Sequence, residues 1–202
     1  DYKGFWLPRS FVGHGTLAEY WACREKVAVM DLSALRKFDV SGPDAEALLQ
    51  KVQTRDLRKL AMLAIPLGIQ VAYEGLSWGR TVNEFTTAWD VVSRADMPNL
   101  GLGLDSFHLF ATQTPLDDLE LLDPEKIFLV QLADFMWQEI RSVEERITTA
   151  RHFRVFPGEG VHSEALADLV RRLHALGYRG DYSFEVFNDD YQQIPLPVVA
   201  QR

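Results

Sequence analysis

The fold is decided by residues 67–108, which read LGIQVAYEGLSWGRTVNEFTTAWDVVSRADMPNLGLGLDSFH. A nearly continuous apolar run ends on Glu74, residues 81–95 then carry apolar side chains at helical spacing, and a second apolar run ends on Asp105. Strands that alternate with helices of this length predict βαβ units and a parallel sheet. Strands that are apolar on both faces are typical of a sheet with both faces covered.

The same alternation continues toward the C-terminus. KIFLVQLAD at 126–134 predicts a third strand, HFRVFPGEG at 152–160 a fourth and DYSFEVF at 181–187 a fifth. Between the last two, residues 163–178 have the apolar spacing of an amphipathic helix that ends at Gly177. The sequence therefore predicts an α/β fold with about five parallel strands.

The first sixty residues differ from the rest of the chain in their predicted secondary structure and in their charge. They predict a helix over 16–28, a short strand over 37–40 and a helix that opens with Pro43, which together make a small α+β segment. Residues 1–60 carry 10 Lys and Arg against 8 Asp and Glu, whereas the remaining residues carry 11 against 21. We therefore expect two domains, 1–60 and 61–202.

Composition excludes several classes of protein. The chain has 202 residues, is 47% hydrophobic and 25% charged, and has a net charge of −8. These are globular values, and the acidic balance argues against nucleic acid or an anionic membrane surface as a partner. No apolar run is long enough to predict a membrane span. The single cysteine, Cys23, cannot form an internal disulfide, which predicts a cytoplasmic protein.

Four polar residues stand at or near the ends of four predicted strands, where parallel α/β sheets build their sites. Any one of them alone is better explained as a solvated strand end. Together they form an all-oxygen set of three carboxylates and one amide, which suits Mg²⁺, Mn²⁺ or Co²⁺ better than a Cys/His zinc site. The four residues are Glu74, Asp105, Gln131 and Glu185.

Several motifs carry a family resemblance: YEGLSWGR, GLDSFH, QLAD, RHFRVFPGEG and SFEVFND. In this order they resemble the xylose-isomerase-like TIM-barrel superfamily, most of all its bacterial 3-dehydroshikimate dehydratases, over about residues 61–200. The resemblance implies that the four strand-end residues are metal ligands. Many members of the superfamily have His where this chain has Gln131, and Gln at this position points to the dehydratase branch.

The resemblance also implies an incomplete barrel. About five C-terminal strands are expected, and the first three βα units of the eight-stranded barrel have no counterpart. An open sheet edge has to be covered. The N-terminal segment or a second copy of the chain, as a homo-oligomer, would cover it.

Three further residues are candidates for contact with a small-molecule substrate. His108 follows Asp105 by three residues and matches a substrate-contacting His of the family, so we expect it to bind substrate or transfer a proton. Arg154 is interpreted either as a surface ion pair or as a fork that binds a substrate carboxylate. Trp78 is expected to line the pocket, whereas support of the site by Glu159 from further out is the less favoured interpretation of that residue.

The implied reaction is a metal-dependent dehydration of 3-dehydroshikimate to protocatechuate. The metal would bind the ketone oxygen and stabilise the enolate formed when an α-proton leaves, after which the β-hydroxyl departs as water. The same enolate chemistry serves sugar and inositol-derivative isomerases, which therefore remain an alternative. A third hypothesis is an inactive fusion that has inherited its ligands.

Residues 19–60, from EYWACREKVAVMDLS to KVQTRDLRKL, resemble a different family. They are similar to the start of the glycine-cleavage T-protein, or aminomethyltransferase, fold. The folate-binding and catalytic regions of that family have no counterpart in this chain, so we do not expect aminomethyl transfer.

Overall fold

The computed structural model describes residue 15, residues 17–18, residue 21, residues 57–199 and residue 201. Of the helix predicted over 16–28, Leu17, Ala18 and Trp21 are helical. The rest of that helix, and the strand and helix predicted after it, lie outside the described residues. The chain divides into two compact units, and the second, Arg55–Arg202, contains the sheet and the helices described below.

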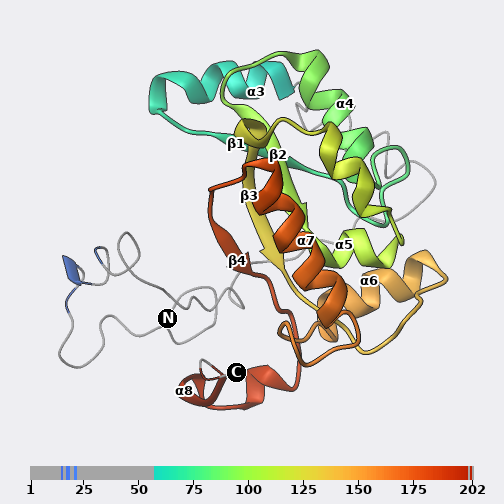
Figure 1. The fold of residues 1–202 in the computed structure, drawn as a ribbon. Helices are drawn as coiled ribbons and strands as arrows, with labels where there is room; N and C mark the ends of the chain where they lie inside the picture. The colour runs from blue at the N-terminus through green and yellow to red at the C-terminus, as the bar shows by residue number, and fades with distance from the viewer. Residues whose placement is uncertain (1–14, 16, 19–20, 22–56, 200, 202) are drawn as a thin grey trace, which may run out of the picture. The chain divides into compact units, whose positions relative to one another are not determined.

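A sheet of four parallel strands forms the centre of this unit (Figure 1). Their order in the sheet is the same as their order in the chain, and every neighbouring pair is parallel. The predicted parallel α/β sheet is therefore confirmed, and in the described residues it is an open sheet rather than a closed barrel. The strands are β1 (Val71–Glu74), β2 (Leu100–Asp105), β3 (Ile127–Leu132) and β4 (Tyr182–Phe184).

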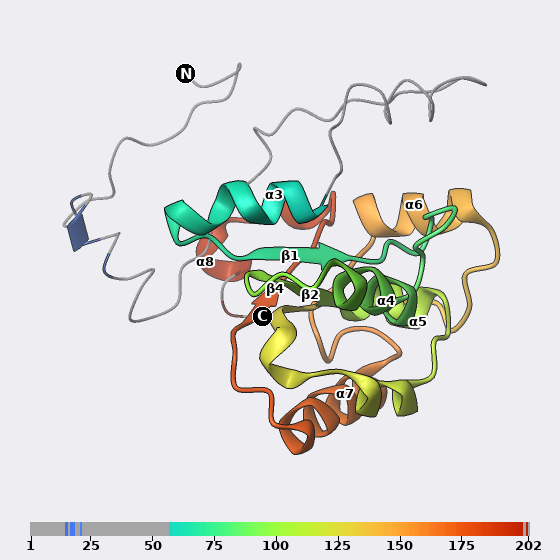
Figure 2. The same cartoon turned by 90° about the horizontal axis from the view of Figure 1, so that it is seen from above.

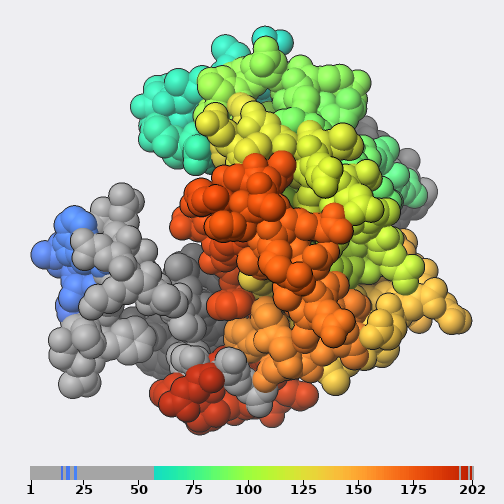
Figure 3. Space-filling model, viewed as in Figure 1, coloured from blue at the N-terminus to red at the C-terminus, as the bar shows by residue number. Residues whose placement is uncertain are grey.

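Helices connect the strands and bury one face of the sheet. The predicted helix at 81–95 forms as α4 (Phe85–Ala95), and the amphipathic segment forms as α7 (Ser163–Leu176), which ends on Gly177 with a φ of 110°. Figure 2 shows α4, α5 and α7 around the strands, and Figure 3 shows α7 at the outer surface. The remaining helices are α3 (Leu57–Ala64), α5 (Ser106–Ala111), α6 (Val143–His152) and α8 (Leu196–Val199), with short 3₁₀ turns η1 (Ile65–Leu67), η2 (Leu116–Leu121), η3 (Pro124–Lys126) and η4 (Tyr191–Gln193).

The core lies between the sheet and these helices. On β2 the alternate residues Leu100, Leu102 and Leu104 are fully buried and belong to one cluster with buried side chains of α4, α5 and α7. The intervening positions of β2, Gly101, Gly103 and Asp105, alternate with the leucines and therefore face the other way. This second face carries the site described below.

The fourth predicted strand, over residues 152–160, is not a strand, and that prediction was wrong. Helix α6 continues to His152, and the segment then makes only two single antiparallel bridges, Phe153 with Asn188 and Val155 with Asp134. Its backbone partners are therefore the loops that follow β3 and β4. Pro157 has no N–H to continue a ladder, so the segment turns away instead.

The predicted boundary between residues 60 and 61 falls within α3, and the division into 1–60 and 61–202 stays a prediction. None of the helices in the described part of the chain combines the length and the hydropathy needed to cross a lipid bilayer.

Gly101 is the position on β2 that tolerates a side chain least. A Cβ atom there would lie 2.3 Å from the carbonyl oxygen of Lys126 and 2.8 Å from the Phe128 ring. We expect Gly101→Ala to lower the free energy of unfolding by about 1–3 kcal/mol, because β2 and β3 have to separate. Gly103→Ala is the matched control, since its Cβ would meet Ala72 at an ordinary 3.7 Å. Urea denaturation of both variants checks the prediction, and equal losses would contradict it.

Candidate functional site

The carboxyl ends of the four strands bring the predicted ligand residues to one edge of the sheet. Glu74 is the last residue of β1 and pairs in register with Gly103, two residues before Asp105. Asp105 ends β2 and pairs with Gln131 of β3, while Glu185 directly follows β4. Because residues paired in register share a face of the sheet, Asp105 and Gln131 point to the same side.

Two of these residues, Asp105 and Glu185, are joined through a buried arginine. Arg154 donates from Nη1 to Asp105 Oδ2 at 2.7 Å and to Glu185 Oε2 at 3.1 Å. The Arg154 and Asp105 side chains are only 3% and 0% exposed. The guanidinium therefore compensates the charge of Asp105, which has no access to water, and of Glu185, whose side chain is 31% exposed.

Glu74 completes the acidic cluster. Its side chain is 30% exposed, yet Oε1 is buried and has no hydrogen-bond partner among the described residues. Burial, followed by the negative charges of Asp105 and Glu185, raises the pKa of Glu74 to about 8. Burial raises the pKa of Glu185 as well. Ionisation of both carboxyl groups is therefore unfavourable unless a cation binds to them.

His108 lies against the same cluster from α5. Its Nε2 is 3.6 Å from Glu74 Oε1 and 3.6 Å from Asp105 Oδ2, and its side chain is 3% exposed. Asp105 fixes the start of α5 by accepting a hydrogen bond from the backbone N–H of Phe107 at 2.9 Å. Burial lowers the pKa of His108 to about 4, so the imidazole is neutral at neutral pH.

The tautomer of His108 follows from its other nitrogen. The backbone N–H of Ser77 points to Nδ1 at 3.2 Å, which requires a lone pair on Nδ1. The neutral ring then carries its proton on Nε2, which faces the carboxylates. In this arrangement His108 is a donor, and ligation of a metal through Nε2 would require a different protonation state.

The donor set fits a divalent cation. Glu74, Asp105 and His108 offer ligand atoms that all lie within 4.8 Å of one another, and they form a candidate metal-binding triad in which His108 would ligate only after Nε2 had lost its proton. The buried and unpartnered Oε1 of Glu74 is an acceptor that a cation would satisfy. Sequence reasoning placed His108 beside the metal rather than on it. The Asp105–His108 spacing of three residues on one short helix was the signal for their proximity.

Arg154 is buried, so its interpretation as a surface ion pair was wrong. Besides its two carboxylate contacts, Nε donates to the carbonyl of Ala150 at 3.0 Å, and the guanidinium lies 4.5 Å from the centre of the Phe107 ring. Its predicted contact with substrate stays a prediction, and its observed contacts are with the acidic cluster.

The remaining candidates lie at varying distances from the cluster. Trp78 packs against His108 with ring centroids 4.8 Å apart, and its role in lining a substrate pocket stays a prediction. Glu159 instead accepts hydrogen bonds from the backbone of Phe156 and the hydroxyl of Tyr191. Sequence reasoning did not single out Ser77, which is 1% exposed and contacts His108.

Comparison with known proteins identifies relatives of this chain. The family described as "Xylose isomerase-like TIM barrel" matches residues 27–201. A 3-dehydroshikimate dehydratase of Pseudomonas aeruginosa is 45% identical over 140 residues, 69% of this chain and 21% of that protein. A 3-dehydroshikimate dehydratase of Pseudomonas putida is 35% identical over 191 residues, 88% of this chain and 29% of that protein. The chain thus spans less than a third of these relatives.

Two further relatives are an inosose isomerase and a protein whose crystal structure contains a zinc atom. An inosose isomerase of Halalkalibacterium halodurans is 32% identical over 139 residues, 68% of this chain and 46% of that protein. A crystal structure of an IOLI protein with a binding zinc atom is 28% identical, with a TM-score of 0.62, and the match covers 72% of this chain and 50% of that one.

The comparisons do not support the aminomethyltransferase resemblance of the N-terminal residues. The barrel family instead begins to match at residue 27, well before the strands. Since that match covers most of the sequence, the chain belongs to the xylose isomerase-like TIM barrel family.

Proposed function

We propose that this chain provides the metal site of a 3-dehydroshikimate dehydratase, a hydro-lyase that forms protocatechuate. The observation that carries the proposal is the acidic cluster at the carboxyl edge of the sheet, in which Glu74 Oε1 is buried without a partner. The two dehydratase relatives, at 45% and 35% identity, support this reaction above others of the family. Because the chain spans less than a third of each of them, the activity of the whole protein is part of the proposal.

Glu74, Asp105, Gln131 and Glu185 would hold the cation. Oxygen donors of this kind suit Mg²⁺, Mn²⁺ or Co²⁺. When bound, the cation would supply Lewis-acid polarisation of a carbonyl oxygen of the substrate. The positive charge of the cation would lower the raised pKa values of Glu74 and Glu185, so that both would bind it as ionised carboxylates.

His108 and Arg154 would act on protons and charge. His108 holds a proton on Nε2 and would donate a hydrogen bond to a substrate oxygen that approaches the cluster. Arg154 holds Asp105 and Glu185 in place through Nη1, and its positive charge acts against the rise that burial causes in the pKa of Glu185. The rings of Trp78 and Phe107 make T-shaped contacts with the His108 ring, whose side chain is 3% exposed. In the net reaction the substrate loses an α-proton and its β-hydroxyl as water, and enolisation completes the aromatic ring.

The direct test is turnover by the full chain. Incubation with Mn²⁺ and 3-dehydroshikimate is expected to produce the ultraviolet absorbance of protocatechuate. Glu185→Ala, checked for folding by circular dichroism, is expected to produce none, because it removes one of the proposed ligands. Absorbance that grows equally fast in the variant, or no absorbance in either protein, would refute the proposal.

A second candidate is isomerisation of a keto-inositol. It is favoured by the inosose isomerase, of which the chain covers 46%, a larger share than of either dehydratase. Removal of an α-proton beside a polarised carbonyl is common to both reactions. A panel of inososes with Mn²⁺, followed by proton exchange in D₂O, separates the two activities. If neither reaction occurs while Mn²⁺ still raises the melting temperature, the chain binds metal without turnover.

A further inference from the structure

Ser77, in the loop between β1 and α4, orients the imidazole of His108. Its backbone N–H reaches Nδ1 at 3.2 Å, and its hydroxyl lies 3.0 Å from the same atom. Ser77 and His108 are both buried. The direction of the Ser77 N–H, which belongs to the Leu76–Ser77 peptide group, therefore decides which nitrogen of His108 carries the proton.

Arg146 of α6 contacts the other side of Ser77. Its Nη1 donates to the Ser77 carbonyl oxygen at 3.1 Å, across 69 residues of sequence. That carbonyl belongs to the peptide that leads into Trp78, whose ring packs edge-on against His108. The Arg146 guanidinium thus anchors the peptide between the two loop residues that touch the imidazole.

The position of Arg146 is not explained by its own helix. Helix α6 begins with a capping box formed by Ser142 and Glu145, and Arg146 is the fourth residue of the helix. A cation this close to the N-terminus of a helix is disfavoured by the helix dipole. Its Nε is also buried without a hydrogen-bond partner among the described residues. The side chain is thus held in place despite two unfavourable terms.

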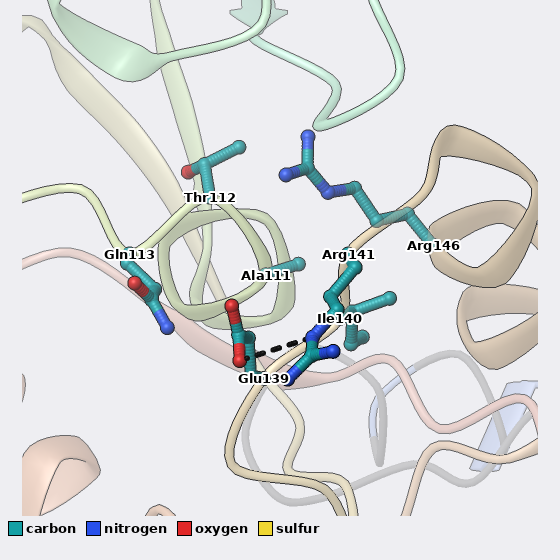
Figure 4. Close-up of a pocket in the computed structure, with 7 residues that line it drawn as sticks. All are labelled: Ala111, Thr112, Gln113, Glu139, Ile140, Arg141 and Arg146. Carbon is teal, nitrogen blue, oxygen red and sulfur yellow. Dashed lines mark hydrogen bonds and ion pairs between the residues drawn. The ribbon is translucent and has the colours of Figure 1, made fainter.

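Surface ion pairing does not explain it either. Arg146 lines a pocket of about 170 Å³ together with Glu139 and Arg141. Figure 4 shows Glu139 paired with Arg141, while the Arg146 guanidinium points away from that pair. Its contact with Ser77 is the one that reaches the candidate site.

We propose that Arg146 is a positioning residue, which fixes the Ser77–Trp78 peptide and thereby keeps His108 in the tautomer with its proton on Nε2. This inference rests on the proposed function only where turnover is measured. Arg146 touches neither the acidic cluster nor the ring of His108, so its effect passes through the loop.

The test uses the full chain labelled with ¹⁵N-histidine. Long-range ¹H–¹⁵N correlations distinguish the two neutral tautomers, and the His108 signals are identified by their loss in His108→Asn. We expect a single form with Nε2 protonated in the wild type and in Arg141→Met, the matched control from the same pocket. Arg146→Met is expected to give both tautomers or exchange-broadened signals. Arg146→Lys, which can still donate to the Ser77 carbonyl, is expected to restore the single form.

Kinetics give a second readout. Arg146→Met is expected to lower kcat for 3-dehydroshikimate by about 10–100-fold, as changes to supporting residues around a site typically do. The KM and the Kd for Mn²⁺ should stay within about twofold of the wild-type values, since no cluster contact is lost.

A wild-type tautomer pattern in folded Arg146→Met would overturn the inference. If Arg146→Met does not fold, Arg146→Gln takes its place with the same two outcomes. If the wild type has no turnover, the proposed function fails, while the tautomer pattern still decides the role of Arg146.

Discussion

Mn²⁺ is expected to bind this chain up to about tenfold more tightly for each unit that the pH rises from 6 toward 8. The reason is Glu74, whose pKa is raised to about 8 by burial and by its acidic neighbours. A carboxyl group has to lose its proton before it can ligate a cation, so binding is coupled to release of that proton. Glu185, whose pKa is also raised, acts in the same direction. His108, with a pKa of about 4, stays neutral over this range.

Without metal the same group makes folding stability fall as the pH rises. In the unfolded chain Glu74 titrates near its ordinary value of 4.5, whereas the folded protein keeps the proton up to about pH 8. Between these two values the folded state binds more protons than the unfolded state. Its stability is therefore highest below pH 4.5 as far as this group is concerned, and it declines by up to about 1.4 kcal/mol per pH unit until pH 8.

Calorimetric titration with Mn²⁺ at several pH values, and urea denaturation in EDTA at the same values, measure both effects. Glu74→Gln is the control, because it keeps the shape of the side chain and removes the titrating proton. It should bind Mn²⁺ weakly and should lose its share of the pH dependence in EDTA. A Kd for Mn²⁺ that does not change between pH 6 and 8 would contradict the assignment of Glu74.

Arg154→Met is expected to lower the free energy of unfolding by about 3–5 kcal/mol at pH 8 in EDTA. The variant keeps much of the apolar stem but leaves Asp105 and Glu185 without their shared cation, and removal of one partner from a buried ion pair has a cost of this size. Asp105 has no access to water to replace the lost contact, because its side chain is 0% exposed. Urea denaturation of the variant and the wild type measures the difference.

Two controls separate this effect from a general loss of charge. Arg171→Met on α7 removes an exposed ion pair with Asp168 and should change stability by no more than about 0.5 kcal/mol. Saturating Mn²⁺ should stabilise Arg154→Met more than the wild type, because the guanidinium no longer repels the cation. A loss below about 1 kcal/mol in Arg154→Met would show that the carboxylates do not depend on this arginine.

The sheet could be predicted from the sequence because its signal is local. The apolar runs that end on Glu74 and Asp105 lie on either side of one amphipathic helix, and few folds other than a βαβ unit are compatible with that pattern. The segment at 152–160 has a similar alternation of apolar residues but does not form a strand. Its backbone forms bridges with the segments at Asp134 and Asn188, and contacts with such distant residues cannot be read from the local periodicity of the sequence.

The candidate site was predictable to the same extent. Strand ends in a parallel sheet share one edge, so the residues at those ends had to meet. The place of Arg154 could not be derived in this way, because its partners are 49 and 31 residues away and are chosen by packing. The contact of Ser77 with His108 depends on the path of a loop, for which the sequence offers no repeat or period.

Because the strands lie in the sheet in their chain order, the residues of the candidate site come from one continuous segment of the sequence. In the described part of the chain, no strand from elsewhere is inserted between β1 and β4, and the acidic cluster with its arginine and histidine lies wholly between Glu74 and Glu185. One uninterrupted stretch of gene therefore encodes all of these groups. A recombination event that joined this segment to a different domain would transfer all residues of the acidic cluster together.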